Sequence, residues 1–158
     1  MNSWWERHGV PRLIKCACSQ GQIMKARSRV VPLAAGDVLE LGCGGGINMA
    51  FYDPARLKSY SGVDPSAGLL DRSREAAQAI GIEADIRGGV GEAIPFASQS
   101  FDTVLCTFTL CSVDDQMQVL SEMRRVLRPG GLLVVEVGSA ADDEGEPGDA
   151  FDAFVGGR

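Results

Sequence analysis

The residues with the clearest potential for binding chemistry are glycines that follow a short apolar run. Residues 38–41 are mostly apolar, include the acid Glu40, and lead directly into Gly42 and Gly44. Because glycine lacks a Cβ atom, the backbone here can turn sharply, adopt positive φ and let a ligand approach closely. Residues 47–52 are compatible with a helix, whose first turn would present free N–H groups to that ligand. The pattern predicts a strand, a tight turn and a helix start, with a nucleotide-like cofactor across the turn.

The spacing of these residues distinguishes between cofactor classes. A dinucleotide-binding turn has the pattern G-x-G-x-x-G/A, but its last position falls here on Ile47. The phosphate-binding loop of nucleotide hydrolases needs a lysine after its glycines, and none follows. Glu40 instead precedes the first glycine, and a carboxylate there repels a pyrophosphate but attracts a cation. S-adenosylmethionine (SAM), which carries a sulfonium and an ammonium group and no phosphate, fits this pattern.

A second acid favours a cofactor that carries a ribose. Residues 59–64 predict another short strand, which ends in Asp64. Doubly wound folds place a carboxylate about 20 residues after the glycine turn, on the ribose hydroxyls. A carboxylate accepts two hydrogen bonds from a cis-diol, so we expect Asp64 to hold the ribose.

Four blocks follow one another along the chain at natural spacing: residues 38–46, Gly-Val-Asp-Pro-Ser at 62–66, residues 91–96 with 100–102, and Arg-Arg-Val-Leu-Arg-Pro-Gly-Gly at 124–131. Together they resemble class I SAM-dependent methyltransferases. Residues 5–14, 48–54 and 109–113 narrow the resemblance to type 11 methyltransferase domains of the phospholipid N-methyltransferase-like and thiol methyltransferase-like kind. The resemblance covers about residues 4–138. It implies a SAM-dependent enzyme that methylates N, S or O of a small-molecule or lipid acceptor.

The candidate cofactor-binding residues follow from the motifs and the resemblance. They are Glu40, Gly42, Cys43, Gly44, Asn48, Asp64, Pro65, Ser66, Gly91, Glu92 and Thr107. In the family an Asp often contacts the adenine, but its position falls here on Val90, so backbone groups and Glu92 are expected to replace it. The alternative for Glu92 is a loop carboxylate in water or a helix cap.

No protein nucleophile is expected, because the sulfonium of SAM already activates the methyl group. Cys111 is therefore interpreted as a packed thiol. An amine or thiol acceptor must lose a proton, and His8, the single histidine, is the candidate to assist; its alternative is a structural or exposed role. In the family, N-terminal helices cap the cofactor, so Trp4 and Trp5 are expected to form a lid or to pack as ordinary aromatics.

Composition narrows the function classes. The chain has 158 residues, 45% of them hydrophobic, which predicts one domain with a real core. The net charge of −6, without a basic run, argues against nucleic-acid binding and against docking on anionic lipid. No apolar stretch approaches about 18 residues and no signal-peptide core is present, so a cytoplasmic protein is expected. The cysteines lack zinc-site spacing, so no metal is expected.

The expected architecture is a Rossmann-like, doubly wound α/β fold with a mostly parallel sheet and helices on both faces. The periodicity predicts strands at 38–41, 59–64, 83–88, 101–108 and 132–137, and helices at 47–52, 67–80 and 114–127. The last helix is expected to bury Met117, Leu120, Met123, Val126 and Leu127. Residues 1–36 would form a helical cap, 37–138 the SAM-binding core and 139–158 an acidic flexible tail.

The region after residue 138 departs from the family pattern. It is rich in Gly, Asp and Glu, and it leaves no room for strands six and seven. The uncovered edge of strand five could pair with a second copy to form a homodimer. The missing strands would also be explained if the chain were a naturally shortened homologue or a truncated sequence. Two rival functions remain: a non-catalytic protein that binds SAM or a partner chain, and a nicotinamide oxidoreductase, against which the absent third glycine counts.

Overall fold

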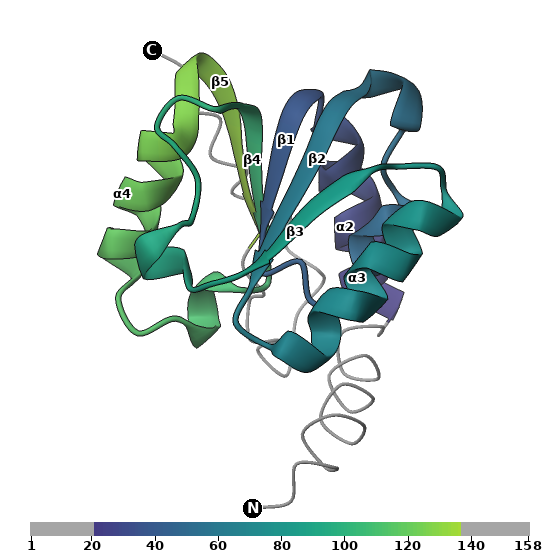
Figure 1. Cartoon of the computed structure of the whole chain (residues 1–158), viewed down its shortest axis with the longest axis horizontal. Helices are drawn as coiled ribbons and strands as arrows, with labels where there is room; N and C mark the ends of the chain where they lie inside the picture. The colour runs from purple at the N-terminus through teal and green to yellow at the C-terminus, as the bar shows by residue number, and fades with distance from the viewer. Residues whose placement is uncertain (1–20, 137–158) are drawn as a thin grey trace, which may run out of the picture.

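The computed structural model describes residues 21–136 and contains a five-stranded parallel sheet (Figure 1). Its strands are β1 (Gly36–Leu41), β2 (Leu57–Asp64), β3 (Ala84–Gly88), β4 (Phe101–Thr107) and β5 (Leu127–Glu136). Their order in the sheet is β3-β2-β1-β4-β5, and all four pairings are parallel. The chain builds outward from β1 on one side and then crosses to β4 on the other. This is the doubly wound Rossmann-like topology that the sequence predicts.

Helices cover both faces of the sheet (Figure 1). Helices α2 (Gly21–Val30) and α3 (Ala67–Ala79) lie on one side, and α4 (Gln116–Val126) lies on the other. Five short 3-10 turns connect these elements: η2 (Val31–Leu33), η3 (Ile47–Ala50), η4 (Pro54–Arg56), η5 (Gly91–Ala93) and η6 (Leu110–Ser112).

Two layers of core follow from the alternation of side chains along each strand. On β1, Val38 packs with the cluster that contains Ala77 of α3, whereas Leu39 packs with Val119 and Met123 of α4. The central strands are apolar on both faces because helices cover both, which explains their continuous hydrophobic runs.

The ends of two helices show how residues at their termini do or do not cap them. Gly81 follows the end of α3: it has φ of +74°, and its N–H donates to the Gln78 carbonyl at 3.0 Å. Ser66 stands at the N-cap of α3, but its side chain makes no capping hydrogen bond. In α4 the cap is Asp115, whose carboxylate accepts the Gln118 N–H at 3.0 Å.

The structure corrects three predictions about local conformation. Residues 47–50 form a single 3-10 turn rather than the start of an α-helix, because the chain turns away at the Asp-Pro pair that follows. Residues 128–131, which separate the predicted helix at 114–127 from the predicted strand at 132–137, are part of β5: Phe101 pairs with Leu127 and Thr103 with Leu132, so the extra residues of β5 bulge out. The strand predicted at 101–108 ends at Thr107.

The predicted buried face of α4 is wrong at its first position. Met117 is 75% exposed, whereas Val119, which the sequence reading omitted, is fully buried. Val119, Met123 and Val126 are four and three residues apart and share one helix face, while Met117 points away from it. Leu127 belongs to β5 rather than to the helix.

Several sequence predictions concern residues outside the described range. The lid with Trp4 and Trp5, the role of His8, the acidic tail and the absence of strands six and seven all involve residues before 21 or after 136. Among residues 21–136, no helix has the length and hydropathy needed to cross a bilayer.

Candidate cofactor-binding site

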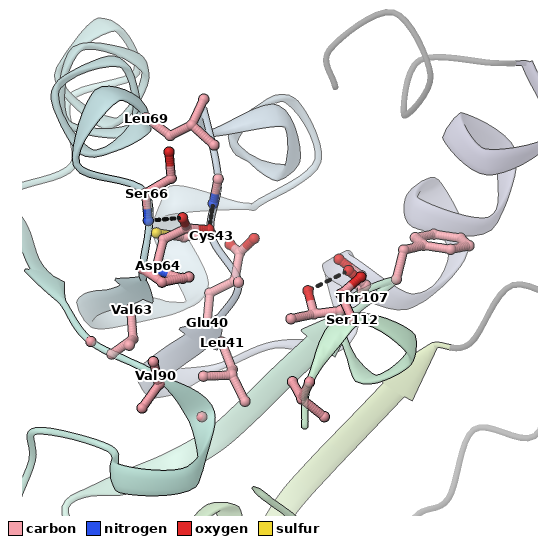
Figure 2. A pocket seen from close by; sticks show the side chains of 18 of the residues that line it. Glu40, Leu41, Cys43, Val63, Asp64, Ser66, Leu69, Val90, Thr107 and Ser112 are labelled. Atoms are coloured by element: carbon pink, nitrogen blue, oxygen red, sulfur yellow. Dashed lines mark hydrogen bonds between the residues drawn. The ribbon is translucent and has the colours of Figure 1, made fainter. Parts of the chain in front are cut away.

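A cavity of about 390 Å³ lies at the carboxyl ends of β1, β2 and β4 (Figure 2). Open α/β sheets bind ligands at this edge, where the strand order reverses on either side of β1. All eleven predicted cofactor-binding residues line the cavity. The structure therefore brings together side chains that the sequence separates by as many as 67 positions, from Glu40 to Thr107.

The glycine turn needs its glycines for packing as well as for conformation. Gly42 has φ of +71°, and a Cβ atom there would overlap the side chain of Thr109. Gly46 has φ of +78°, and a Cβ there would lie 2.7 Å from the Cβ of Ala76 on α3. The predicted side-chain-free bend is confirmed, and it lets α3 and the segment after β4 approach the turn closely.

Asp64 ties the end of β2 to the glycine turn. Its Oδ2 atom accepts the Gly44 N–H at 2.9 Å, and its Oδ1 atom accepts the Ser66 N–H at 2.8 Å (Figure 2). These contacts fix the orientation of a carboxylate that is only 7% exposed. Each oxygen keeps a further lone pair, so the group can still accept hydrogen bonds from a diol.

Glu40 is more deeply buried than its predicted role suggests. It is 2% exposed, and its Oε2 atom accepts hydrogen bonds from the hydroxyls of Tyr52 and Tyr60, both at 2.8 Å. Its Oε1 atom accepts the Asn48 Nδ2–H at 2.8 Å. Burial raises the pKa of Glu40, whereas the hydrogen bonds and the charge of Arg27 oppose that rise. Its predicted contact with the cationic end of a cofactor stays a prediction.

Sequence reasoning missed Arg27, which α2 brings to the cavity. This side chain is 6% exposed, and its Nη1 atom donates to Asn48 Oδ1 at 2.7 Å and to Thr107 Oγ1 at 2.9 Å. The guanidinium carbon lies 4.9 Å from the centroid of the Phe108 ring. Phe108 has φ of +56°, which is strained for a phenylalanine and marks the point where β4 ends at the cavity. The basic stretch before β1 gave no signal that one arginine is buried.

Glu92 contacts the backbone that leads into α4. Its Oε1 atom accepts the N–H groups of Asp114 and Asp115, at 2.9 and 3.2 Å, and so holds the segment before α4. Hydrogen bonds from backbone N–H groups, its own foremost, lower the pKa of Glu92. Its neighbour Val90 is 48% exposed at the cavity, and Gly91 is buried. Contact of this loop with an adenine stays a prediction.

Among residues 21–136, one cysteine differs from its predicted environment. Cys43 and Cys106 are buried, and burial raises the pKa of each thiol to about 12. Cys111 was expected to be packed, but it is exposed, because the one-turn η6 buries Leu110 and turns the next residue outward.

The comparison with known families decides what kind of protein this is. A family model described as a methyltransferase domain matches residues 39–135, which run from the middle of β1 to the last residues of β5. The chain belongs to the class I SAM-dependent methyltransferases. The cofactor of these methyltransferases is SAM.

Individual relatives support the family and differ in their acceptors. The chain is 38% identical over 118 residues to a thiol S-methyltransferase, TMT1B, of Rattus norvegicus, a match that covers 73% of this chain and 46% of that protein. It is 35% identical over 112 residues to a phosphatidylethanolamine N-methyltransferase of Cereibacter sphaeroides, covering 70% and 54%. A solved SAM-dependent methyltransferase of Thermotoga maritima matches with a TM-score of 0.62 and 27% identity, covering 83% and 58%. The chain spans about half the length of the curated relatives it matches.

Proposed function

We propose that this methyltransferase chain binds SAM in the cavity and transfers its methyl group to a small-molecule or lipid acceptor. The observation that carries the proposal is the meeting of the glycine turn and the Asp64 carboxylate at one cavity, where the space beside Gly44 is open to a ligand. The cavity volume of about 390 Å³ falls within the range for small-molecule sites.

The charges along the cavity wall suit a cationic methyl donor. Its described lining contains four carboxylates, those of Glu40, Asp64, Glu92 and Asp114, against one arginine, Arg27. Bound SAM would supply a methyl group already activated by a sulfonium. Asp64 would hold the ribose, and the turn would admit the methionine portion. The protein's contribution to such a displacement is chiefly to position the reactants.

The described lining favours an acceptor that needs little help in losing its proton. Residues 21–136 place no histidine, lysine or tyrosine on the cavity wall, and three of its four carboxylates, those of Glu40, Asp64 and Glu92, already accept hydrogen bonds from the protein. A thiol ionises near pH 8.5, closer to neutrality than an alcohol or a phenol. A thiol is therefore the first candidate acceptor, consistent with the named activity of TMT1B; an amine is the second, consistent with the phosphatidylethanolamine N-methyltransferase.

An acceptor panel tests this proposal. The full chain is incubated with SAM and an alkyl thiol, vesicles that contain phosphatidylethanolamine, or a catechol, and S-adenosylhomocysteine is measured by mass spectrometry. Turnover with the thiol, lost in Asp64→Ala and retained in Asp71→Ala, is the expected result, because the Asp71 side chain is 83% exposed and away from the cavity. Binding of SAM without turnover on any acceptor would refute the enzymatic proposal.

A cytoplasmic location and a homodimer are further parts of the proposal. The described sheet ends at β5, whose outer edge has no neighbouring strand among residues 21–136 and could pair with a second copy. Sedimentation of the full chain at two concentrations would detect that dimer.

A further inference from the structure

Two tyrosines lie behind the cavity wall and contact it through a single carboxylate. Tyr52 and Tyr60 do not line the cavity, and they are 6% and 1% exposed. Their rings pack edge to face, with centroids 5.3 Å apart, inside the core on the α3 side of the sheet. Both hydroxyls lie 2.8 Å from the same oxygen of Glu40, which does line the cavity.

The arrangement around Glu40 fits an ionised carboxylate. An arginine can only donate hydrogen bonds, so the contact from Arg27 requires that the Oδ1 atom of Asn48 face it. The amide nitrogen of Asn48 must then face Glu40 and Thr107, and donate to both. With two phenol hydroxyls on its other oxygen, Glu40 accepts from three donors at once, which a carboxylate satisfies and a protonated acid does less well.

We propose that Tyr52 and Tyr60 are positioning residues of the methyl-donor site, and that their hydroxyls keep Glu40 as an oriented carboxylate at the cavity wall. The inference rests on the proposed binding of SAM. Without the two hydroxyls, a carboxylate that is 2% exposed would lose the donors that replace water and would take up a proton more readily. The site would then lose one negative charge facing a cationic donor.

Other titratable groups around Glu40 also influence its charge. Arg27 of α2 favours its charge, while the thiols of Cys43 in the turn and Cys106 in β4 are both neutral at physiological pH, because burial raises their pKa to about 12. Arg27 also interacts with the buried Glu136 at the end of β5. Burial also raises the pKa of both tyrosines well above the usual value, so neither the two thiols nor the two phenols titrate between pH 5 and 9.

The test is the pH dependence of SAM binding, measured by isothermal titration with the full chain. In the parent, affinity is expected to fall as the pH drops and Glu40 becomes protonated, and Glu40→Gln should remove that part of the profile. Tyr52→Phe and Tyr60→Phe should each move the midpoint upward by about one pH unit, since a hydrogen bond to a charged group is worth about one such unit. Affinity should recover at high pH.

A double-mutant cycle and a matched control separate positioning from general damage. On the Glu40→Gln background, the tyrosine substitutions should leave the dissociation constant for SAM unchanged. Thr103→Val removes another buried hydroxyl, one that donates to the Ala35 carbonyl at 2.9 Å away from the cavity, and it should not move the midpoint. If Tyr60→Phe does not fold, Tyr52→Phe carries the test, because its hydroxyl donates to the same oxygen.

The outcomes distinguish failure of the proposed SAM binding from failure of the role assigned to the two tyrosines. If the folded parent does not bind SAM at any pH, the proposed function fails, and the inference fails with it. If the parent binds SAM but the tyrosine variants keep its midpoint, or weaken binding equally on the Glu40→Gln background, the inference alone is overturned.

Discussion

Replacing Gly42 with alanine tests the physical basis of the turn on which the site depends. Gly42 has φ of +71°, and a Cβ atom added to it would overlap three side-chain atoms of Thr109. The Thr109 hydroxyl donates to the Thr107 carbonyl at 3.1 Å, so the side chain cannot move aside without losing that contact. The substitution therefore combines backbone strain with a steric clash against Thr109, just after the end of β4.

The two effects have separate magnitudes. A left-handed backbone conformation costs an L-residue about 1–2 kcal/mol. Displacing Thr109 would break a hydrogen bond worth about 0.5–1.5 kcal/mol net. The free energy of unfolding of Gly42→Ala should therefore fall by about 1.5–3.5 kcal/mol, the sum of these two contributions.

Gly81 supplies a matched control for the backbone part. It has a similar φ of +74°, but a Cβ there would meet no atom within 4 Å. In urea unfolding, Gly81→Ala should cost only the strain, about 1–2 kcal/mol. Adding Thr109→Ala to Gly42→Ala should restore part of the difference, because it removes the two nearest overlapping atoms. If Gly42→Ala costs no more than Gly81→Ala, the close approach of Thr109 to the turn is not a constraint, and the reasoning is wrong.

Three further predictions concern the ionisation of Asp37 in β1, the accessibility of the thiols and the register of α4. Hydrogen bonds from Ser59 and then from Arg128 lower the pKa of Asp37 to about 2. The stability that Asp37 contributes should therefore be present above pH 4 and lost as the pH falls towards 2. In urea unfolding across that range, the free energy of unfolding should depend less on pH in Asp37→Asn than in the parent. A maleimide should label the exposed Cys111 in the native protein but Cys43 only after denaturation, as peptide mapping would show, and equal labelling would contradict the burial. Met123→Ala should destabilise the fold by about 2–5 kcal/mol, whereas Met117→Ala, at a position 75% exposed, should change stability by less than about 0.5 kcal/mol; similar losses would contradict the helix register.

The sequence predicted those parts of the site that depend on local conformation. Gly42 and Asp64 were identified because a side-chain-free turn and an acid at a strand end each leave a signature at fixed spacing, and both line the cavity. The order of strands and helices also followed from periodicity. The exposed Cys111 was missed because one 3-10 turn decides which of its residues faces inward, and hydrophobicity alone does not show that.

The parts that were not predicted depend on contacts between distant segments. Arg27 is separated from Thr107 by 80 positions, and only the packing of α2 over the sheet brings them within 2.9 Å. The surroundings of Glu40 likewise require that β2 pair with β1, which places Tyr60 beside it. From the sequence alone, the Glu40 carboxylate was expected to face a ligand. In the structure it accepts hydrogen bonds from the protein itself.

The central claim is that the bend at Gly42 and the Asp64 carboxylate form a binding site for a cationic methyl donor with a ribose. Isothermal titration of SAM into the folded full chain and into Asp64→Ala tests it most directly. The account predicts saturable binding to the parent and a loss of tenfold or more in Asp64→Ala, about the value of one hydrogen bond to a charged group. A folded parent that shows no affinity for SAM, or an Asp64→Ala variant that binds it equally well, would contradict the account.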